Sequence, residues 1–333
     1  MICDTLPRHR FAYLPTPLEE APRLSKALGG PRLFIKRDDR SGLTFGGNKA
    51  RIFEFVFGDA LAKGATALIT AAGTQSNHLR EVTAAANKLG LKSVIIVCGQ
   101  RRDEPPQGNL FLFHLLGADI RYYPTFDPHS PELWALQHEI EAELKAQGHT
   151  PYIVHFDLRP GLLGSAAHAN AAEEMAGQFK EQGVVPDVLY VPSGSGVTTS
   201  GFVLGFKHLG LPTRVVGVSV IRPVEEVREA IAHHANRVAD DLGLKTRVEP
   251  SDYEVVDGRG AGYGQITPEV TETLRLVATQ EGLLLDPVYN GKAMAVLIEH
   301  IRAGRLTATQ SAVLVHTGGT PALFHYNREL LAE

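Results

Sequence analysis

The hydrophobic residues of this chain fall into short runs that alternate with longer amphipathic stretches. Runs of four or five branched residues are typical of buried strands, whereas apolar residues spaced three and four apart predict helices. The predicted strands are 33–36, 67–70, 93–97, 119–122, 152–155, 188–191, 215–218 and 312–315. The predicted helices are 48–63, 76–89, 132–147, 166–182, 223–242, 269–281 and 292–303.

This alternation predicts an α/β protein in which each sheet is mostly parallel and is flanked by helices on both faces. A length of 333 residues suggests two domains. No internal repeat, low-complexity tract or long linker divides the chain. We therefore expect two domains that interleave along the sequence.

Composition and charge narrow the class of protein. Hydrophobic residues make up 44% and charged residues 21%, as in ordinary globular proteins. A net charge of −4 without a basic run makes nucleic acid an unexpected partner. Apolar runs such as 94–98 are too short to cross a bilayer, and the charged N-terminus is no secretory signal. Two cysteines, Cys3 and Cys98, are too few for a disulfide framework, which predicts a cytoplasmic protein with Cys98 in its core.

Four polar, glycine-containing segments carry the candidate chemistry: 41–49, 73–78, 193–201 and 316–319. Each of the last three follows a predicted strand directly. Ligands of parallel sheets bind beyond the carboxyl ends of the strands. We therefore expect these three segments to meet in one cleft, between the two domains.

Lys49 closes the first of these segments, after two glycines and an asparagine and ahead of an apolar helix face. A lysine on its own is most often a solvated surface residue. At a helix start that faces a cleft, burial and the helix N-terminus both disfavour the ammonium form. The neutral amine can then react with an aldehyde, so Lys49 is the candidate nucleophile.

The segment 193–201 resembles a phosphate-binding loop. It offers backbone N–H groups at a helix N-terminus, with hydroxyl groups at Ser195, Thr198 and Thr199. An ordinary glycine-rich turn with a hydroxyl cap is the alternative. A dinucleotide site fits worse, because Thr199 stands where the fingerprint needs glycine.

Further polar candidates lie on turns. Residues 75–78 read Gln-Ser-Asn-His and open a predicted helix, which needs fewer polar groups for its cap. Tyr263 and Tyr289 lie on turns containing glycine or proline, where they are candidate acids or hydrogen-bond donors, although tyrosine is more often structural. The histidines lack metal-ligand spacing, and no Gly-x-Ser-x-Gly occurs, so neither a metal site nor a serine hydrolase is expected.

A reactive lysine, a phosphate loop and an amide cluster are together what a pyridoxal phosphate (PLP) enzyme needs. The chain also resembles the fold type II PLP enzymes of the 1-aminocyclopropane-1-carboxylate (ACC) deaminase and D-cysteine desulfhydrase family. The matching stretches run in family order: LPTPL at 14–18, IKRDD at 35–39, GGNKAR at 46–51, QSNHLR at 75–80, SGSG at 193–196, LDPVY at 285–289 and HTGG at 316–319. The resemblance implies a two-domain, tryptophan synthase β-like fold, with a small domain 48–158 inside a large one (1–47 and 159–333), and a homodimer.

The resemblance also implies site residues. For the cofactor they are Lys49, Asn77, Ser195, Gly196, Val197, Thr198 and Thr317; for the substrate they are Ser76, Asn77, His78, Tyr263 and Tyr289. Lys49 would bind the cofactor covalently and remove the α-proton with help from Ser76, and the two tyrosines complete the catalytic set. Asn77 would bond the phenolic oxygen of the cofactor.

Three positions separate the branches of the family. ACC deaminases place glutamate after the Asp-Pro-Val-Tyr tyrosine, read Gln-Ser-Asn-Gln, and read His-Leu-Gly-Gly near the C-terminus. This chain has Asn290, His78 and Thr317 at these positions. By resemblance they favour the D-cysteine desulfhydrase and cysteate sulfo-lyase branch. A hydroxyl at Thr317 leaves the pyridine nitrogen largely neutral, which suits elimination of a good leaving group.

The segment 154–160 departs from the family pattern, which reads close to Ile-Pro-x-Gly-Gly-Ser-Asn. If it borders the cleft, the substrate side chain should differ from that of D-cysteine. Arg159 would then bind an anionic substrate group such as a sulfonate. A surface pair between Arg159 and Asp157 is the alternative.

These features predict a PLP-dependent lyase that removes a β-substituent from a small amino acid and releases a keto acid and ammonia. The alternatives are an ACC deaminase, a cysteate sulfo-lyase, a β-replacing enzyme related to cysteine synthases, and an inactive binding protein with the same fold.

Overall fold

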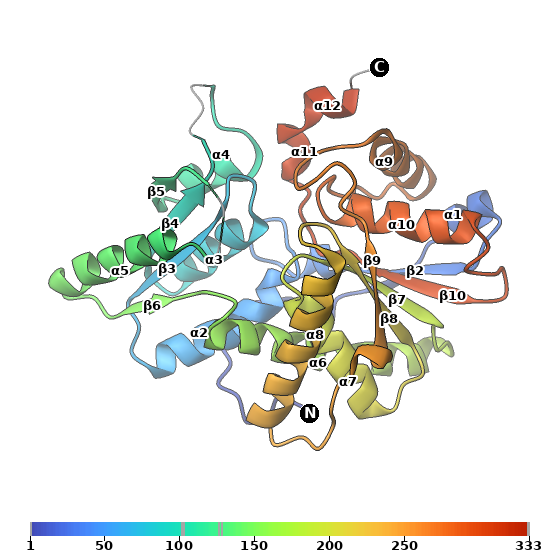
Figure 1. Cartoon of the computed structure of the whole chain (residues 1–333), viewed down its shortest axis with the longest axis horizontal. Helices are drawn as coiled ribbons and strands as arrows, with labels where there is room; N and C mark the ends of the chain where they lie inside the picture. Colours follow the sequence, from blue (N-terminus) through green and yellow to red (C-terminus); the bar gives the residue numbers. More distant parts are fainter. Residues whose placement is uncertain (1, 101–103, 126, 128, 332–333) are drawn as a thin grey trace.

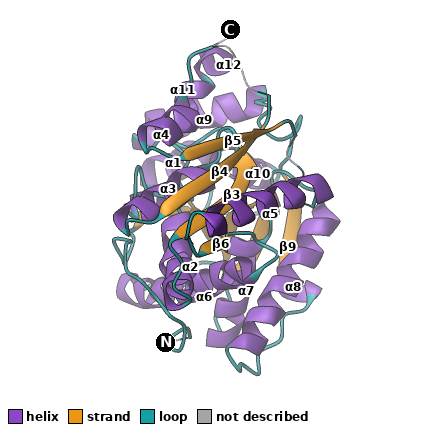
Figure 2. Ribbon diagram, turned by 90° about the vertical axis from the view of Figure 1, so that its left-hand side faces the viewer, coloured by secondary structure: helices purple, strands orange, loops and turns teal. Residues whose placement is uncertain are grey.

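The computed structural model describes residues 2–100, 104–125, 127 and 129–331, and their strands form two sheets (Figure 1, Figure 2). The larger sheet has the order β1 (Leu18–Glu20), β2 (Arg32–Lys36), β10 (Ser311–Val315), β7 (Val188–Ser193), β8 (Arg214–Ser219) and β9 (Tyr253–Asp257). The smaller has the order β5 (Asp119–Tyr123), β4 (Lys92–Cys98), β3 (Ala67–Gly73) and β6 (Pro151–Ile153). Every neighbouring pair is parallel except β1 with β2, so the predicted α/β class is confirmed.

Helices cover both sheets. They are α1 (Pro22–Leu28), α2 (Lys49–Ala62), α3 (Asn77–Lys88), α4 (Gly108–Leu115), α5 (Pro131–Ala146), α6 (Arg159–Gln182), α7 (Val197–Leu209), α8 (Val224–Asp241), α9 (Pro268–Glu281), α10 (Asn290–Arg302), α11 (Ala322–His325) and α12 (Asn327–Leu331), with short 3-10 turns η1 (Asp38–Arg40) and η2 (Pro250–Asp252). Nowhere in the described ranges is a helix long and apolar enough to cross a membrane.

The larger sheet lies between two hydrophobic cores, because successive strand residues point to opposite faces. On β10, Val313 and Val315 enter the core shared with α2, α6, α7 and α8, whereas Ala312 and Leu314 enter the core shared with α9 and α10. Cys98, at the end of β4, is a buried free thiol, as predicted, and burial raises its pKa to about 12.

Glycine residues allow α6 and α7 to pack closely. A Cβ atom on Gly201 would lie 2.2 Å from the backbone oxygen of Ser165, and one on Gly205 would lie 2.4 Å from the Cβ of Ala172. The hydroxyl groups of Ser165 and Ser200 lie 2.8 Å apart at the same contact. This packing fixes the N-terminus of α7, where the predicted phosphate loop enters the helix.

A buried ion network fixes the start of α2. Arg51 donates to Asp38 at 2.9 Å and to Glu174 of α6 at 2.7 Å, and Lys36 contacts the same Glu174 carboxylate at 2.5 Å. Paired charges are tolerated inside a protein only when they are held together in this way. The network connects β2, η1 and α6 to the first turn of α2, which begins with Lys49.

Candidate active site

Lys49 is the first residue of α2 and follows a turn that only glycine fits. Gly46 and Gly47 have φ angles of +66° and +144°, and a Cβ atom on Gly46 would lie 1.9 Å from the backbone oxygen of Asp39. Gly47 forms an isolated β-bridge with Gly318. The turn therefore places Lys49 beside the loop 316–319, which begins where β10 ends.

The environment of Lys49 favours its neutral amine. Burial lowers the pKa of the Lys49 ammonium group, and the nearby Glu81 carboxyl opposes this shift. Since burial is the larger effect, more of the reactive amine is present at neutral pH than for an exposed lysine.

The loop after β7 ends at the N-terminus of α7, where the first backbone N–H groups of the helix point outward. Gly196, the N-cap of α7, has a φ of +85° and no side chain that caps the first turn. Asn48 donates to the Thr198 hydroxyl at 2.8 Å and so connects the lysine turn to this loop. The Thr199 hydroxyl was predicted to belong to the phosphate-binding loop. It is instead fully buried and shares a hydrogen bond with the Ser193 hydroxyl at 3.0 Å.

Asn77, the first residue of α3, has an orientation set by its neighbours. Its Oδ1 accepts hydrogen bonds from Arg80 at 2.8 Å and from Asn109 at 3.0 Å. The Nδ2 group consequently points away from these donors, and it would lie 3.0 Å from a Cβ atom on Gly319. It is a hydrogen-bond donor directed at the space between α3 and loop 316–319.

Ser76 retains a hydroxyl proton that can bind a ligand, whereas the His78 ring is uncharged. Ser76 is the N-cap of α3, and its oxygen accepts the Leu79 N–H at 3.2 Å, so its own proton remains available to a ligand. Thr70 donates its proton to the Val154 carbonyl, so Thr70 must accept from His78 Nε2 at 2.9 Å. Burial, with smaller effects from Lys49 and His155, lowers the pKa of His78 to about 3, which makes it a neutral imidazole.

Tyr263 and Tyr289 form a pair at the same cleft. Their hydroxyl oxygens are 3.3 Å apart, and the two rings meet edge to face. The Tyr289 ring lies 3.8 Å from a Cβ placed on Gly194, and the Tyr263 hydroxyl lies 4.0 Å from one on Gly73. Burial raises the pKa of both hydroxyl groups, although 38% of Tyr263 is exposed. Both tyrosines are therefore protonated donors at neutral pH.

In the loop 316–319, the Thr317 side chain contacts an uncharged amide group. Thr317 donates its hydroxyl to Asn290 Oδ1 at 3.2 Å, and Asn290 Nδ2 donates to Asp286 at 2.6 Å. Asp286 also accepts the backbone N–H groups of Val288, Tyr289 and Asn290, so its two oxygens are fully used. Asn290 thus connects Thr317 to the start of α10.

The structure does not support the predicted role of Arg159. Its side chain donates to Asp59 at 2.9 Å and to Asp241 at 3.2 Å, and these two carboxylates neutralise it. The alternative pair with Asp157 is absent as well, since Asp157 faces His129 and His155. Arg159 begins α6, and its partners Asp59 and Asp241 lie on α2 and α8, so these ion pairs form in place of the pair with Asp157.

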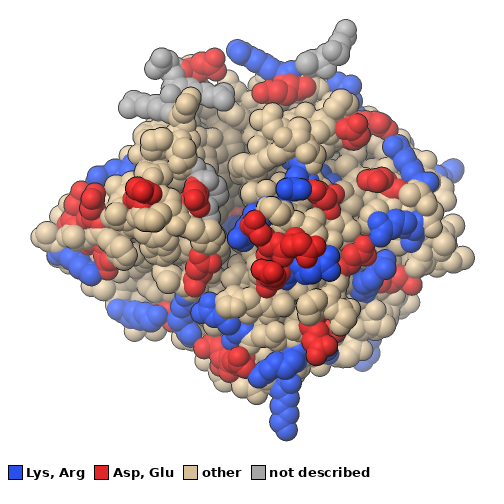
Figure 3. Space-filling view, in the orientation of Figure 1, with Lys and Arg blue, Asp and Glu red and all other residues tan. Residues whose placement is uncertain are grey.

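The four polar segments therefore meet between the two sheets. Residues 73–78 come from the end of β3, residues 193–196 from β7 and residues 316–319 from β10. The face drawn in Figure 3 is hollowed between the part that carries the smaller sheet and the rest of the molecule. The N-terminus of α7, a close backbone contact at Gly47 and Gly318, and the Lys49 amine beside it are complementary to a phosphorylated aromatic aldehyde. Across the described residues, no cluster of histidine, cysteine or acidic side chains could hold a metal ion.

The comparisons with known proteins agree with this geometry. The family model for pyridoxal-phosphate dependent enzymes matches residues 10–318. The chain is 37% identical to a Burkholderia cenocepacia protein named 1-aminocyclopropane-1-carboxylate deaminase, over 98% of each chain. It is also 37% identical to a Pyrococcus abyssi protein named "Putative 1-aminocyclopropane-1-carboxylate deaminase", over 99% of this chain and 97% of that one.

A solved structure described as an ACC deaminase homologue superposes with a TM-score of 0.89 at 36% identity, and the match covers 99% of this chain and 97% of that one. Fold and site together define a fold type II PLP enzyme. The chain belongs to the family of pyridoxal-phosphate dependent enzymes, and within it to the lyases and deaminases related to ACC deaminase.

Several residues that shape the site were not predicted from the sequence. Asn48, Arg80 and Glu81 are buried around Lys49, and Lys292 holds the loop that carries Tyr263. In the sequence, each of them resembles an ordinary exposed polar position of a helix. Only Asn48 had a usable signal, because it stands next to the lysine on the glycine turn.

Lys292 provides a test of how the Tyr263 loop is held. Its Nζ donates to the backbone oxygens of Arg259 at 2.7 Å and Gly262 at 2.6 Å. Lys292→Met keeps the packing but removes both bonds. We expect kcat/KM to fall by about 10- to 100-fold with unchanged cofactor content, since small misplacements of catalytic groups have effects of this size.

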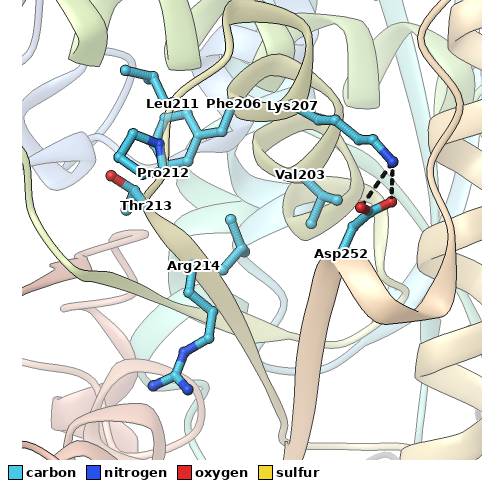
Figure 4. A pocket seen from close by; sticks show the side chains of 9 residues that line it. Val203, Phe206, Lys207, Leu211, Pro212, Thr213, Arg214 and Asp252 are labelled. Carbon is cyan, nitrogen blue, oxygen red and sulfur yellow. Dashed lines mark hydrogen bonds and ion pairs between the residues drawn. The ribbon is translucent and has the colours of Figure 1, made fainter.

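A matched control is Lys207→Met. Lys207 lies in a shallow surface pocket between α7 and β8 and pairs with Asp252 at 2.6 and 2.8 Å (Figure 4). The Lys207→Met variant should have the same steady-state kinetics as the wild-type enzyme. Wild-type kinetics in Lys292→Met would show that the two hydrogen bonds of Lys292 do not position Tyr263.

Proposed function

We propose that this enzyme removes a β-substituent from a small amino acid, in the manner of a D-cysteine desulfhydrase, and releases a keto acid and ammonia. When bound, PLP supplies an aldehyde that joins the substrate amine and a ring that withdraws electrons from the α-carbon. The protein must then bind the carboxylate, orient the α-proton towards a base and receive that proton.

The residues of this chain can fill those roles. Lys49 is the proposed covalent attachment point and the base for the α-proton, because burial lowers the pKa of its amine. Asn77 Nδ2 would donate to the cofactor ring, and the first turn of α7 would hold the phosphate through residues 195–198. Ser76 retains a free hydroxyl proton for the substrate carboxylate.

Tyr263 and Tyr289 would act on the leaving group. Since the two hydroxyl groups are within hydrogen-bonding distance, one donates to the other and the second remains free to donate outward. A protonated tyrosine beside the substrate stabilises negative charge that develops on a departing sulfur or oxygen.

The observation that carries the proposal is the neutral contact between Thr317 and Asn290. If PLP binds with its ring nitrogen towards Thr317, that nitrogen would meet a neutral hydroxyl group, which can turn its proton from Asn290 Oδ1 to the nitrogen, and no carboxylate. The Asp286 carboxylate behind it has its acceptor sites filled. A ring that stays unprotonated is a weak electron sink, and this favours substrates whose β-substituent leaves readily.

ACC deamination is the second candidate, and the names of the relatives favour it. A single assay separates the two. Purified enzyme is given ACC, the D- and L-forms of cysteine, cysteate, chloroalanine and O-acetylserine, and the keto acids are identified. The proposal predicts pyruvate from at least one β-substituted amino acid and little ketobutyrate from ACC. Efficient ketobutyrate release, without pyruvate from the others, would contradict it.

A β-replacing enzyme would give product only with an added thiol, and bound cofactor without turnover would indicate an inactive binding protein.

Two further proposals concern the domains and the assembly of the chain. We propose that 48–158 forms a small domain, since β3 to β6 all lie within it, and that two copies of the chain form a homodimer.

A further inference from the structure

Glu81 is a fully buried carboxyl group in the first turns of α3, and it faces the turn that carries Lys49. Its Oε1 would lie 2.3 Å from a Cβ atom on Gly47, so the carboxyl packs against the glycine two residues before Lys49. The backbone N–H of Ala50, the second residue of α2, lies close enough to this carboxyl to lower its pKa. Its Oε2 has no hydrogen-bond partner among the described residues.

The charges around Glu81 come from three elements. Arg80, adjacent on α3, reaches Oε1 at 3.2 Å but also donates to the Gly46 carbonyl and to Asn77. Lys49 on α2 attracts the carboxylate, whereas Asp38 on η1 repels it. Burial outweighs the attractive groups and raises the pKa of Glu81 to about 8.

The groups that face Lys49 complete this set. The Glu81 carboxyl opposes the loss of the Lys49 proton. The half-buried His78 on α3 and the buried His168 on α6 are neutral imidazoles, and the Lys49 charge further disfavours their protonated forms. Because neither histidine supplies a negative charge, Glu81 is the acidic partner placed to balance an ammonium ion at position 49. An enclosed site strongly disfavours an unbalanced charge.

We propose that Glu81 is the counter-charge that sets the protonation state of Lys49. The pair shares one proton: when it lies on the nitrogen of Lys49, Glu81 is a carboxylate, and when that nitrogen is neutral the proton lies on Glu81 as CO2H, so the pair has no net charge in either state. Glu81 is thus a positioning residue that acts through Lys49. The inference rests on the proposed role of Lys49 as the cofactor lysine.

A pH titration of the holoenzyme tests this inference. The visible absorption of bound cofactor changes when the nitrogen of Lys49 gains or loses its proton, so its midpoint reports that protonation without any turnover. Removal of a nearby negative charge destabilises the protonated form. In Glu81→Gln the midpoint should therefore move to lower pH by about one unit, a tenfold change in the equilibrium. Glu81→Asp, which keeps a carboxylate farther from Lys49, should shift it less.

The matched control is Glu54→Gln. Glu54 is another buried glutamate, on α2 itself, but its carboxylate binds Arg8 and the backbone N–H groups of residues 11 and 12. An unshifted midpoint in Glu81→Gln, or an equal shift in Glu54→Gln, would overturn the inference. If Glu81→Gln does not fold, an unshifted midpoint in Glu81→Asp decides against it. Failure of the proposed role of Lys49 looks different, because the wild-type protein would then carry no cofactor on Lys49, and failure of the proposed reaction would appear in the keto acid assay while the titration midpoint remains measurable.

Discussion

Replacement of Lys49 by alanine is expected to lower kcat/KM for every substrate by at least about 10³-fold, which is typical for loss of a group that is both covalent attachment point and base. The change removes the amine at the start of α2 and should leave the fold intact, because the ion network of Arg51 still holds that helix. Steady-state keto acid assays measure the loss, and unfolding curves check the fold.

The control for this variant is Lys245→Ala, which removes an exposed lysine far along the chain. It should retain wild-type kinetics. Lys49→Ala with more than a tenth of wild-type activity would show that another group performs the chemistry.

The second large effect concerns stability. Gly201→Ala places a methyl group 2.2 Å from the backbone oxygen of Ser165 and 2.5 Å from the Cβ of His168, where backbone must move. Overpacking of this kind costs about 1–3 kcal/mol of the free energy of unfolding. The shift of α7 against α6 should also weaken cofactor retention, since α7 carries the phosphate loop.

Gly177→Ala is the matched comparison within α6. A Cβ atom at Gly177 meets nothing within 4 Å, so alanine should stabilise the helix by about 0.5–1 kcal/mol. Denaturant unfolding of both holoenzymes measures the difference. Equal stabilities would show that the close approach of α6 and α7 is not as tight as described.

Much of the fold follows from the sequence because its central strands are apolar and bounded by glycine. All eight predicted strands are present, although β6 ends at Ile153 rather than at residue 155. The strands β1 and β9 lie at the sheet edges, and their polar residues gave no apolar run. Helix α6 begins at Arg159, seven residues before the predicted start, because Pro160 is accommodated in its first turn.

The candidate site residues that lie on short polar loops could be identified from the sequence. Lys49, the loop 193–196 and residues 75–78 each follow a recognisable turn, and strand order brings them together. The buried partners were not predictable. Arg80 and Glu81 are adjacent charges in a helix, a pattern typical of solvent-exposed positions, and only the packing of α3 against α2 encloses them. The ion pairs of Arg159 were not predictable either, because its partners, Asp59 and Asp241, are distant in the sequence.

The central claim is a covalent bond between PLP and the amine of Lys49, and one measurement tests it directly. The purified holoenzyme is reduced with borohydride, digested and analysed by peptide mass spectrometry. We predict one modified peptide, with the mass of the reduced cofactor on Lys49. Cofactor found on another lysine, or an unmodified Lys49 in protein that contains bound PLP, would contradict the account.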